Sequence, residues 1–315
     1  MKSVLISWFV IFFAIGMLLG FFARDLGISH FKKQQEWSIG IYQGSSPFNV
    51  TPINPFPVLT KGDVKDRDAL FVADPFMIKA KDLWYMFFEV KDGYDYQTDI
   101  AYATSKDGLR WKYGKVVLNE QFPQSYPYVF EWQGEYYMLP ESYPTNSIRL
   151  YKANNFPEEW ILESVLIRGK DYVDPSIFRY DNKWWIFAST SQNKDLYLFY
   201  SYDLKGPWVE HQTSPVITNN RNIARPGGRI IEYNESLYRV AQDDDPYYGN
   251  QVRIFKIDEL SEEYYSEHEI EESPIIKAGD NFWSSEGMHQ FDVHEIEEGK
   301  WMAVVDGYKE TIVRQ

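Results

Sequence analysis

The chain has no cysteine among its 315 residues. Disulfide bonds, thiolate metal sites and cysteine nucleophiles are therefore excluded, although this absence fits oxidising and reducing compartments equally well. Basic residues are also few, because 32 lysines and arginines stand against 46 aspartates and glutamates, giving a formal net charge of −14. Nucleic-acid binding relies on clustered positive charge, so the composition argues against a nucleic-acid partner.

The signatures of several common enzyme classes are missing as well. The sequence contains no P-loop, no G-x-S-x-G and no dinucleotide fingerprint, so phosphoryl transfer, serine hydrolysis and a nucleotide cofactor have no support. The five histidines show no metal-ligand spacing. The acidic triplet 243–245 could bind calcium, but such triplets are common in loops. We therefore predict neither a cofactor nor a metal.

The sequence does contain a hairpin-like pattern that recurs with a fixed internal spacing. Each copy opens on a short polar or Asp-Pro segment, continues as an alternating strand, turns, and returns through an aromatic-rich strand. In three copies the opening and closing residues are fifteen positions apart, and two looser copies follow. The five pairs are Asp74 and Glu89, Tyr126 and Glu141, Asp174 and Ser189, Arg225 and Asp243, and His289 and Asp306. Five copies roughly fifty residues apart, each a meander of short strands, predict an all-β fold, a five-bladed β-propeller.

The repeat also predicts where a functional site would lie. In an antiparallel hairpin, the residue that opens the first strand and the residue that closes the second lie at the same end. Because the first strand of each blade is the innermost one, its opening residue faces the axial funnel. We therefore expect the ten paired residues to ring this funnel and to form the site.

The ends of the repeat region predict how the ring closes. An isolated strand is predicted over 37–44, before the first blade, whereas the last blade shows only two clear strands, 290–296 and 300–305. An open blade edge would invite aggregation, so the early strand is expected to complete the last blade. The propeller is thus predicted over residues 37–315.

The N-terminal region is a separate element. Residues 4–23 form a run of twenty residues without a charged side chain, long enough to cross a hydrocarbon core of about 30 Å. We predict a single transmembrane signal anchor over 1–24, followed by a short polar linker over 25–36. The alternative is a cleaved signal peptide, with Ala14-Ile15-Gly16 as a weak cleavage site.

The orientation of this anchor is open between two interpretations. Arg24, Lys32 and Lys33 outnumber Lys2 and favour a cytoplasmic domain by the positive-inside rule, whereas a charged and then apolar start is typical of an exported signal anchor. We expect export, with the propeller held at the outer face of a membrane.

Short motifs of the chain resemble two related groups of five-bladed propellers. Ala73-Asp74-Pro75-Phe76 and Val173-Asp174-Pro175-Ser176, each followed by a turn and an aromatic strand, resemble the blade openings of glycoside hydrolase family 43. A larger set is similar to the N-terminal domain of glucosamine inositolphosphorylceramide transferases, over about residues 37–308. Its motifs are Ser125-Tyr126-Pro127, Pro140-Glu141-Ser142, Asp174-Pro175-Ser176, Gly206-Pro207-Trp208 and Ala224-Arg225-Pro226-Gly227-Gly228-Arg229.

The family-43 resemblance implies a base opening the first blade, an orienting aspartate opening the third and a glutamate acid opening the fourth. By position, the base is Asp74 and the orienting residue is Asp174. Arg225 stands where the acid would be, and arginine cannot act as a general acid near neutral pH. Carboxyl groups crowded in one funnel raise each other's pKa, so a neighbouring blade could supply the proton. The candidates are Glu141, Glu89 and Glu286, of which Glu141 joins Asp74 and Asp174 as a predicted catalytic residue.

The arginines offer a second interpretation. Arg225 and Arg229 could grip an anionic group of a glycan through bidentate hydrogen bonds, or Arg225 could form a buried structural ion pair with Asp243. Aromatic residues make up 18% of the chain; such rings pack between blades, and those near a funnel also stack on sugars. The predicted substrate-binding residues are Glu89, Tyr126, Arg225, Arg229, Asp243, Glu286, His289 and Asp306.

Two functions follow from these observations. The first is a membrane-anchored carbohydrate-active enzyme that hydrolyses or transfers a glycosyl unit of a polysaccharide or glycoconjugate. The second is a non-catalytic glycan-binding propeller, accessory to a glycosyltransferase. The missing glutamate acid of the fourth blade favours the glycan-binding function. The carboxyl groups that remain around the funnel favour the enzyme.

Overall fold

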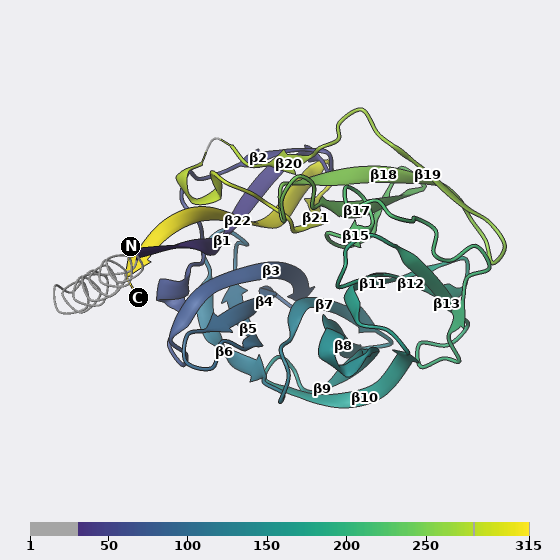
Figure 1. The fold of residues 1–315 in the computed structure, drawn as a ribbon, viewed down its shortest axis with the longest axis horizontal. Coiled ribbons are helices and arrows are strands. Elements are labelled where there is room, and N and C mark those ends of the chain that lie inside the picture. Colours follow the sequence, from purple (N-terminus) through teal and green to yellow (C-terminus); the bar gives the residue numbers. More distant parts are fainter. Residues whose placement is uncertain (1–30, 280, 315) are drawn as a thin grey trace, which may run out of the picture. The chain divides into compact units, whose positions relative to one another are not determined.

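The structure, a computed structural model, describes residues 31–279 and 281–314. Within the unit Glu36–Lys309, the strands form five antiparallel sheets arranged as blades around a common centre (Figure 1). Residues 31–35 and 310–314 group separately, where Thr311 Oγ1 donates a hydrogen bond to the Gln34 carbonyl and Lys33 pairs with Glu310. The predicted five-bladed propeller is confirmed.

The first three blades are four-stranded meanders in chain order. The first contains β3 (Ala69–Ala80), β4 (Leu83–Asp92), β5 (Thr98–Ser105) and β6 (Lys112–Leu118). The second contains β7 (Ser125–Trp132), β8 (Glu135–Glu141), β9 (Ser147–Asn155) and β10 (Glu159–Arg168). The third contains β11 (Tyr172–Tyr180), β12 (Lys183–Thr190), β13 (Tyr197–Ser201) and β14 (Val209–Glu210).

The fourth blade is more irregular, because its innermost strand is broken. It contains β15 (Arg225–Pro226), β16 (Ile231–Tyr233), β17 (Ser236–Asp243), β18 (Gln251–Leu260), β19 (Tyr265–Glu269) and β20 (Ile276–Lys277). Both β15 and β16 pair with β17. Short 3-10 helices occur in three connections of the described chain: η1 (Lys61–Asp63), η2 (Tyr143–Thr145) and η3 (Phe282–Ser284).

The fifth blade joins strands from both ends of the chain. Its order is β21 (Phe291–Glu297), β22 (Lys300–Arg314), β1 (Phe31–Ser46) and β2 (Asn49–Pro52), so the early strand does complete the last blade (Figure 1). Strand β1 begins at Phe31, earlier than the expected start at Trp37, and so takes up part of the expected linker.

The predicted transmembrane anchor lies in residues 1–30, outside the described residues, and it stays a prediction. In the part of the chain that the structure describes, no helix has the length and apolar character needed to cross a membrane.

A bulge in each of the first three inner strands turns one residue of each toward the axis. Asp74, Tyr126 and Asp174 have φ values of 53°, 47° and 48°, and each precedes a proline. The strand register skips at the same places, so Glu89 lies opposite Ala73 rather than Asp74. Bulges of this kind re-aim side chains and are frequent beside functional sites.

The hydrophobic core lies between the faces of neighbouring blades. One buried cluster joins Phe87 of the first blade, Tyr128 and Leu139 of the second and Trp184 of the third. A second cluster joins the fourth and fifth blades through Val240 and Phe291, among others. Because each blade packs on two neighbours, the funnel walls are held rigidly from outside.

Candidate functional site

A cavity of about 490 Å³ opens at the predicted end of the axis. Three carboxyl groups line it, those of Asp74, Glu89 and Glu141, together with Arg225. Loops that connect the second and third strands of three blades complete the wall, contributing Tyr96, Tyr143 and Tyr248. Of the ten paired residues expected to ring the funnel, Asp74, Glu89, Glu141 and Arg225 line this cavity.

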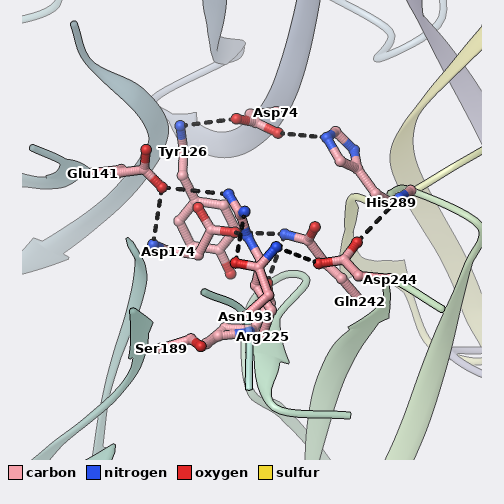
Figure 2. Close-up of polar contacts among 12 residues, drawn as sticks. Asp74, Tyr126, Glu141, Asp174, Ser189, Asn193, Arg225, Gln242, Asp244 and His289 are labelled. Carbon is pink, nitrogen blue, oxygen red and sulfur yellow. Dashed lines mark hydrogen bonds and ion pairs between the residues drawn. The ribbon is translucent and has the colours of Figure 1, made fainter. Parts of the chain in front are cut away.

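Asp74 is held by both neighbouring blades (Figure 2). Its Oδ2 accepts a hydrogen bond of 3.2 Å from the Tyr126 backbone N–H. Its own N–H donates to Oδ2 of Asp306 at 3.0 Å. Nε2 of His289 lies 3.5 Å from Asp74 Oδ1. Burial raises the pKa of Asp74 to about 6, against the effect of the neighbouring imidazole. Asp74 is therefore a carboxylate at neutral pH with a raised basicity.

His289 lies between two carboxylates. Its Nδ1 is 2.8 Å from the Asp306 carboxylate, and its ring stacks on Trp37 of β1 with centroids 4.1 Å apart. Burial lowers the pKa of His289, but Asp306 and Asp74 outweigh that effect and raise this pKa to about 9. At neutral pH the ring is an imidazolium, which stabilises the ionised form of Asp74.

The pKa values of Glu89 and Glu141 are raised as well. Burial, with the charge of Asp74 beside it, raises the pKa of Glu89 well above its ordinary value. Burial and the nearby Asp174 likewise raise the pKa of Glu141, although Arg225 opposes this shift. The cavity therefore holds three carboxyl groups whose pKa values are raised by burial, and a protonated carboxyl beside a carboxylate is the pairing that acid–base chemistry at a glycosidic bond requires.

Arg225 connects the predicted catalytic residues. Its Nε donates to Oδ2 of Asp174 at 2.5 Å, and its Nη2 lies 3.4 Å from Oε2 of Glu141 (Figure 2). Its Nη1 donates to Oδ1 of Asn193 at 3.1 Å, and the guanidinium lies 5.3 Å from the centroid of the Tyr248 ring. The buried ion pair of Arg225 is thus with Asp174 and Glu141, not with Asp243.

Asp174 lies deeper than the cavity wall and is completely buried. Its backbone N–H donates to Oε2 of Glu141 at 3.3 Å, and Gln242 Nε2 donates to its Oδ2. Its Oδ1 has no hydrogen-bond partner among the described residues. Asp174 therefore orients Glu141 and Arg225 from the protein interior behind the cavity wall.

Asp243 does not face the cavity, in contrast to the prediction. It accepts hydrogen bonds of 2.8 Å from Gln251 and Arg253 on the next strand, β18. In the fourth blade Arg225 lies opposite Gln242, so Gln242 takes the inward position. The sequence repeat assigned Asp243 as the closing residue, one position after Gln242. The assignment failed because this blade has more residues between its opening and closing positions and lacks the bulge of the first three blades.

Other expected positions also lie outside the cavity lining, among them His289 and Asp306, which contact Asp74 from behind the wall. Arg229 crosses the axial channel, where it donates to Asp292 Oδ1 at 2.8 Å and to the carbonyls of Met77 and Val129. Glu286 is an exposed loop residue. Ser189 is buried and donates to the carbonyl of Asp195.

Tyr126 supports the site rather than lining it. Its hydroxyl is fully buried, 2.8 Å from Ser176 Oγ, and it donates to the Gly228 carbonyl at 3.1 Å. Its contribution to the cavity is the backbone N–H that binds Asp74.

Sequence reasoning missed several residues that position Arg225. Asn193 links Arg225 Nη1 to Oδ2 of Asp244, whose Oδ1 accepts the Gly249 N–H at 3.0 Å. Asn193 and Asp244 sit in loops outside the hairpin repeat; no local pattern marks Asn193, and the acidic triplet that contains Asp244 was considered only as a calcium site. Gln242 could have been found by allowing the closing residue to shift by one position.

One group has the composition of a metal site. Ligand atoms of Asp74, His289 and Asp306 lie within 4.8 Å of one another. The Nδ1 of His289 is already bound by Asp306, and the raised pKa of His289 keeps this ring protonated, which opposes metal ligation. The prediction of no metal stays a prediction.

Comparison with known proteins adds a family and a fold. The family described as glucosamine inositolphosphorylceramide transferase 1, N-terminal, matches residues 30–308. Glucosamine inositolphosphorylceramide transferase 1 of Oryza sativa subsp. japonica is 38% identical over 299 residues, covering 86% of this chain and 40% of the relative. The Arabidopsis thaliana protein of the same name is 35% identical over 330 residues, covering 97% and 43%. The chain spans about two-fifths of the length of these relatives.

Solved structures support the propeller architecture. A putative glycoside hydrolase from Parabacteroides distasonis has a TM-score of 0.62 at 12% identity, covering 81% of this chain and 95% of that one. Cellvibrio cellulosa alpha-L-arabinanase complexed with arabinohexaose has a TM-score of 0.55 at 16% identity, covering 76% and 94%. Identities this low show a shared fold alone.

Proposed function

Because the chain belongs to the family of glucosamine inositolphosphorylceramide transferase 1 N-terminal domains, we propose that its axial cavity cleaves or transfers a glycosyl unit of a polysaccharide or glycoconjugate. The names of its relatives and of its structural neighbours support a carbohydrate-related function. The observation that carries the proposal is the set of three carboxyl groups in one cavity, Asp74, Glu89 and Glu141, whose pKa values burial raises.

We assign the roles of the carboxyl groups from their positions in the cavity and from the directions of their pKa shifts. Asp74 acts as base, taking a proton from the attacking water or acceptor hydroxyl as that oxygen bonds to the anomeric carbon. Glu141 donates its proton to the leaving glycosidic oxygen as the old C–O bond breaks, and Asp174 orients Glu141 through its N–H. Glu89 is a second carboxylic acid on the same cavity wall.

A specific observation favours the second function, glycan binding without turnover. Arg225 replaces the carboxyl that the family-43 resemblance implies at the fourth blade, and it ties Asp174 to Glu141. A cation at this place stabilises ionised carboxylates and opposes proton donation. In that case the chain would serve as a recognition module beside a glycosyltransferase, in keeping with its match to only part of its relatives.

The proposed location is a membrane surface. The uncharged run 4–23 is long enough to span a bilayer of about 30 Å, and we propose that it anchors the propeller on the exported side. Alkaline extraction of membranes tests the anchor, because an integral protein stays in the pellet. Protease added to intact cells or vesicles tests the side.

The decisive experiment is a release assay on the full chain in detergent micelles. Wild type, Asp74→Asn and Asp82→Asn are incubated with a panel of polysaccharides and glycoconjugates, and freed sugar is quantified. Asp82 is an exposed turn residue at the other end of the same hairpin, so Asp82→Asn controls for the substitution itself. Release by wild type and Asp82→Asn, but not by Asp74→Asn, supports the enzyme.

The same panel discriminates the second function. Saturable binding without release, unaffected by Asp74→Asn and weakened by Tyr96→Ala on the cavity wall, would overturn the catalytic roles in favour of recognition. The absence of both release and binding across the panel would refute the carbohydrate site.

A further inference from the structure

We propose that the cavity binds a neutral glycan and that Tyr248 determines this specificity, with its hydroxyl group hydrogen-bonded to a hydroxyl of the sugar. The proposal rests on the proposed carbohydrate function of the same cavity and names the class of glycan that it takes. Among the described residues, the fourth blade contributes two residues to the cavity lining, Arg225 and Tyr248. These two residues therefore decide what the fourth blade offers to a glycan.

The guanidinium of Arg225 is already engaged within the protein. Its Nε donates to Asp174, its Nη1 to Asn193 and its Nη2 to Glu141. A bidentate grip on a carboxylate or phosphate requires two N–H donors that are free on the same edge of the guanidinium. Because each nitrogen has a partner, no edge of Arg225 keeps both of its donors open for an anionic group.

The second cation of the described lining, Lys91, is also engaged. Its Nζ donates a hydrogen bond to the Tyr96 carbonyl. Burial raises the pKa of Glu89, and the charge of Lys91 opposes this rise, so the ammonium lies close enough to act on that carboxyl group. A uronate or phosphate in this cavity would meet three carboxyl groups and no free cation of the described lining. Like charges brought together in a binding site weaken binding strongly.

The Tyr248 hydroxyl is the polar group of the fourth blade that stays open. It belongs to the cavity lining, and no residue in the described part of the chain forms a hydrogen bond with it. Burial raises the pKa of this phenol well above its ordinary value; Arg225 opposes the shift, and the charge of Asp74 adds to it. The hydroxyl is therefore uncharged at neutral pH and can donate and accept a hydrogen bond, as a sugar hydroxyl also can.

The Tyr248 ring is held between the residues that support the two sides of the site. Its centroid lies 5.2 Å from that of His289, with the rings almost perpendicular at 86°, and the Arg225 guanidinium lies 5.3 Å from it. His289 contacts Asp74, whereas Arg225 contacts Glu141. The ring thus has a supporting role that does not depend on its hydroxyl.

The loop that carries Tyr248 is fixed at the next residue. The Gly249 N–H donates to Oδ1 of Asp244 at 3.0 Å, and the Gly249 carbonyl accepts the Met288 N–H at 2.9 Å. Gly249 has a φ of 71°, and a Cβ at this position would lie 2.8 Å from the Trp37 ring. The Tyr248 hydroxyl is therefore presented to the cavity from a preorganised loop, which lowers the entropic cost of binding.

The test separates the hydroxyl from the ring. Tyr248→Phe removes the hydroxyl and keeps the ring contacts. Tyr247→Phe is the matched control, because Tyr247 precedes Tyr248 on the same loop, is 45% exposed and lies outside the cavity lining. Each full-length protein, in a detergent without a sugar head group, is titrated by calorimetry with oligosaccharides of galactose, glucose and mannose and with the corresponding uronates. Arabinose and xylose oligosaccharides extend the neutral set, and urea unfolding compares the stability of the three proteins.

We expect the neutral member of a pair to bind and the uronate to bind about 10-fold more weakly or worse. Tyr248→Phe should weaken binding of the neutral ligand about 5- to 10-fold, because the sugar hydroxyl loses its partner, and Tyr247→Phe should not. Neither variant should change the urea midpoint. Among the monodeoxy derivatives of the tightest ligand, one should bind wild type and Tyr248→Phe equally, since it lacks the hydroxyl that Tyr248 contacts.

The outcomes distinguish this proposal from the function on which it rests. Preferential binding of the uronates would overturn the neutral class. Equal binding of the neutral ligand by wild type and Tyr248→Phe, or a loss that persists with every monodeoxy derivative, would overturn the role of the hydroxyl and leave the carbohydrate site standing. Neither binding nor release across the whole panel would refute the carbohydrate site, and this proposal with it.

Discussion

Replacing Arg225 by methionine removes the one cation that contacts both Asp174 and Glu141 in the described site. Arg225 has a side chain only 12% exposed, and its partner Asp174 is 1% exposed in its side chain. After the change, Gln242 Nε2 is the remaining side-chain donor to the Asp174 carboxylate, and Oδ1 still has no partner. A buried charge is then left without its counter-ion.

The size of the effect follows from this geometry. At a separation near 3 Å and an effective dielectric of about 20, two unit charges attract by about 5 kcal/mol. Removing one partner of a buried ion pair typically costs about 3–5 kcal/mol, so we expect the free energy of unfolding of Arg225→Met to fall by that amount. Adding Asp174→Asn removes the stranded charge, so the double variant should lose about 2 kcal/mol less than the sum of the singles.

The assay is urea unfolding of the full chain in detergent micelles, followed by the fluorescence of its 11 tryptophans. Arg110→Met is the matched control, since the Arg110 side chain is 91% exposed and its pair with Asp107 should contribute at most about 1 kcal/mol. The reasoning fails if Arg225→Met is no more destabilising than Arg110→Met, or if the double variant shows simple additivity.

Three further predictions concern the cavity. The imidazolium of His289, with its pKa raised from the ordinary 6.5 to about 9, stabilises the fold by about 3 kcal/mol below pH 6.5, and this stabilisation is lost as the pH rises through 9. The difference in urea midpoint between wild type and His289→Gln should therefore shrink between pH 6 and 10; a constant difference would contradict the assignment. The rate of sugar release should rise with pH through about 6 as Asp74 ionises. In His289→Gln the midpoint of this pH–rate profile should move upward, because the cation that lowers the Asp74 pKa is gone. A pH–rate profile that does not move would exclude Asp74 as the base. Trp37→Ala should cost about 3–5 kcal/mol in unfolding free energy, since a buried ring packed on three others is deleted; a loss below about 1 kcal/mol would show that the closing strand is not held through this ring.

The repeat in the sequence was sufficient for the architecture because hairpin geometry is local. A fixed step between an opening and a closing residue determines which end of a blade they share, so Asp74, Glu89 and Glu141 could be assigned to one cavity before any coordinates. The same logic misplaced Asp243, because it assumed that the fourth blade has the same strand register as the first three. In the fourth blade, Arg225 lies opposite Gln242.

Other features of the site depend on contacts that no local pattern encodes. Asn193 reaches Arg225 from a loop of the third blade, and Trp37 reaches His289 from the other end of the chain. The engagement of Arg229 with three inner strands likewise depends on how the blades converge. These placements are set by packing across blades, which the spacing of one hairpin does not determine.

The closure of the fifth blade by β1 has a consequence for how the protein is made. Ribosomes add about 5–20 residues per second, so the roughly 260 residues between Trp37 and Lys300 take on the order of 13–50 seconds to appear. During that interval β1 has no β22 to pair with, and His289 has not yet been synthesised to receive Trp37. Asp74 therefore gains its imidazolium neighbour only after the first four blades have been synthesised, and the nascent chain carries those blades before it carries His289 beside Asp74.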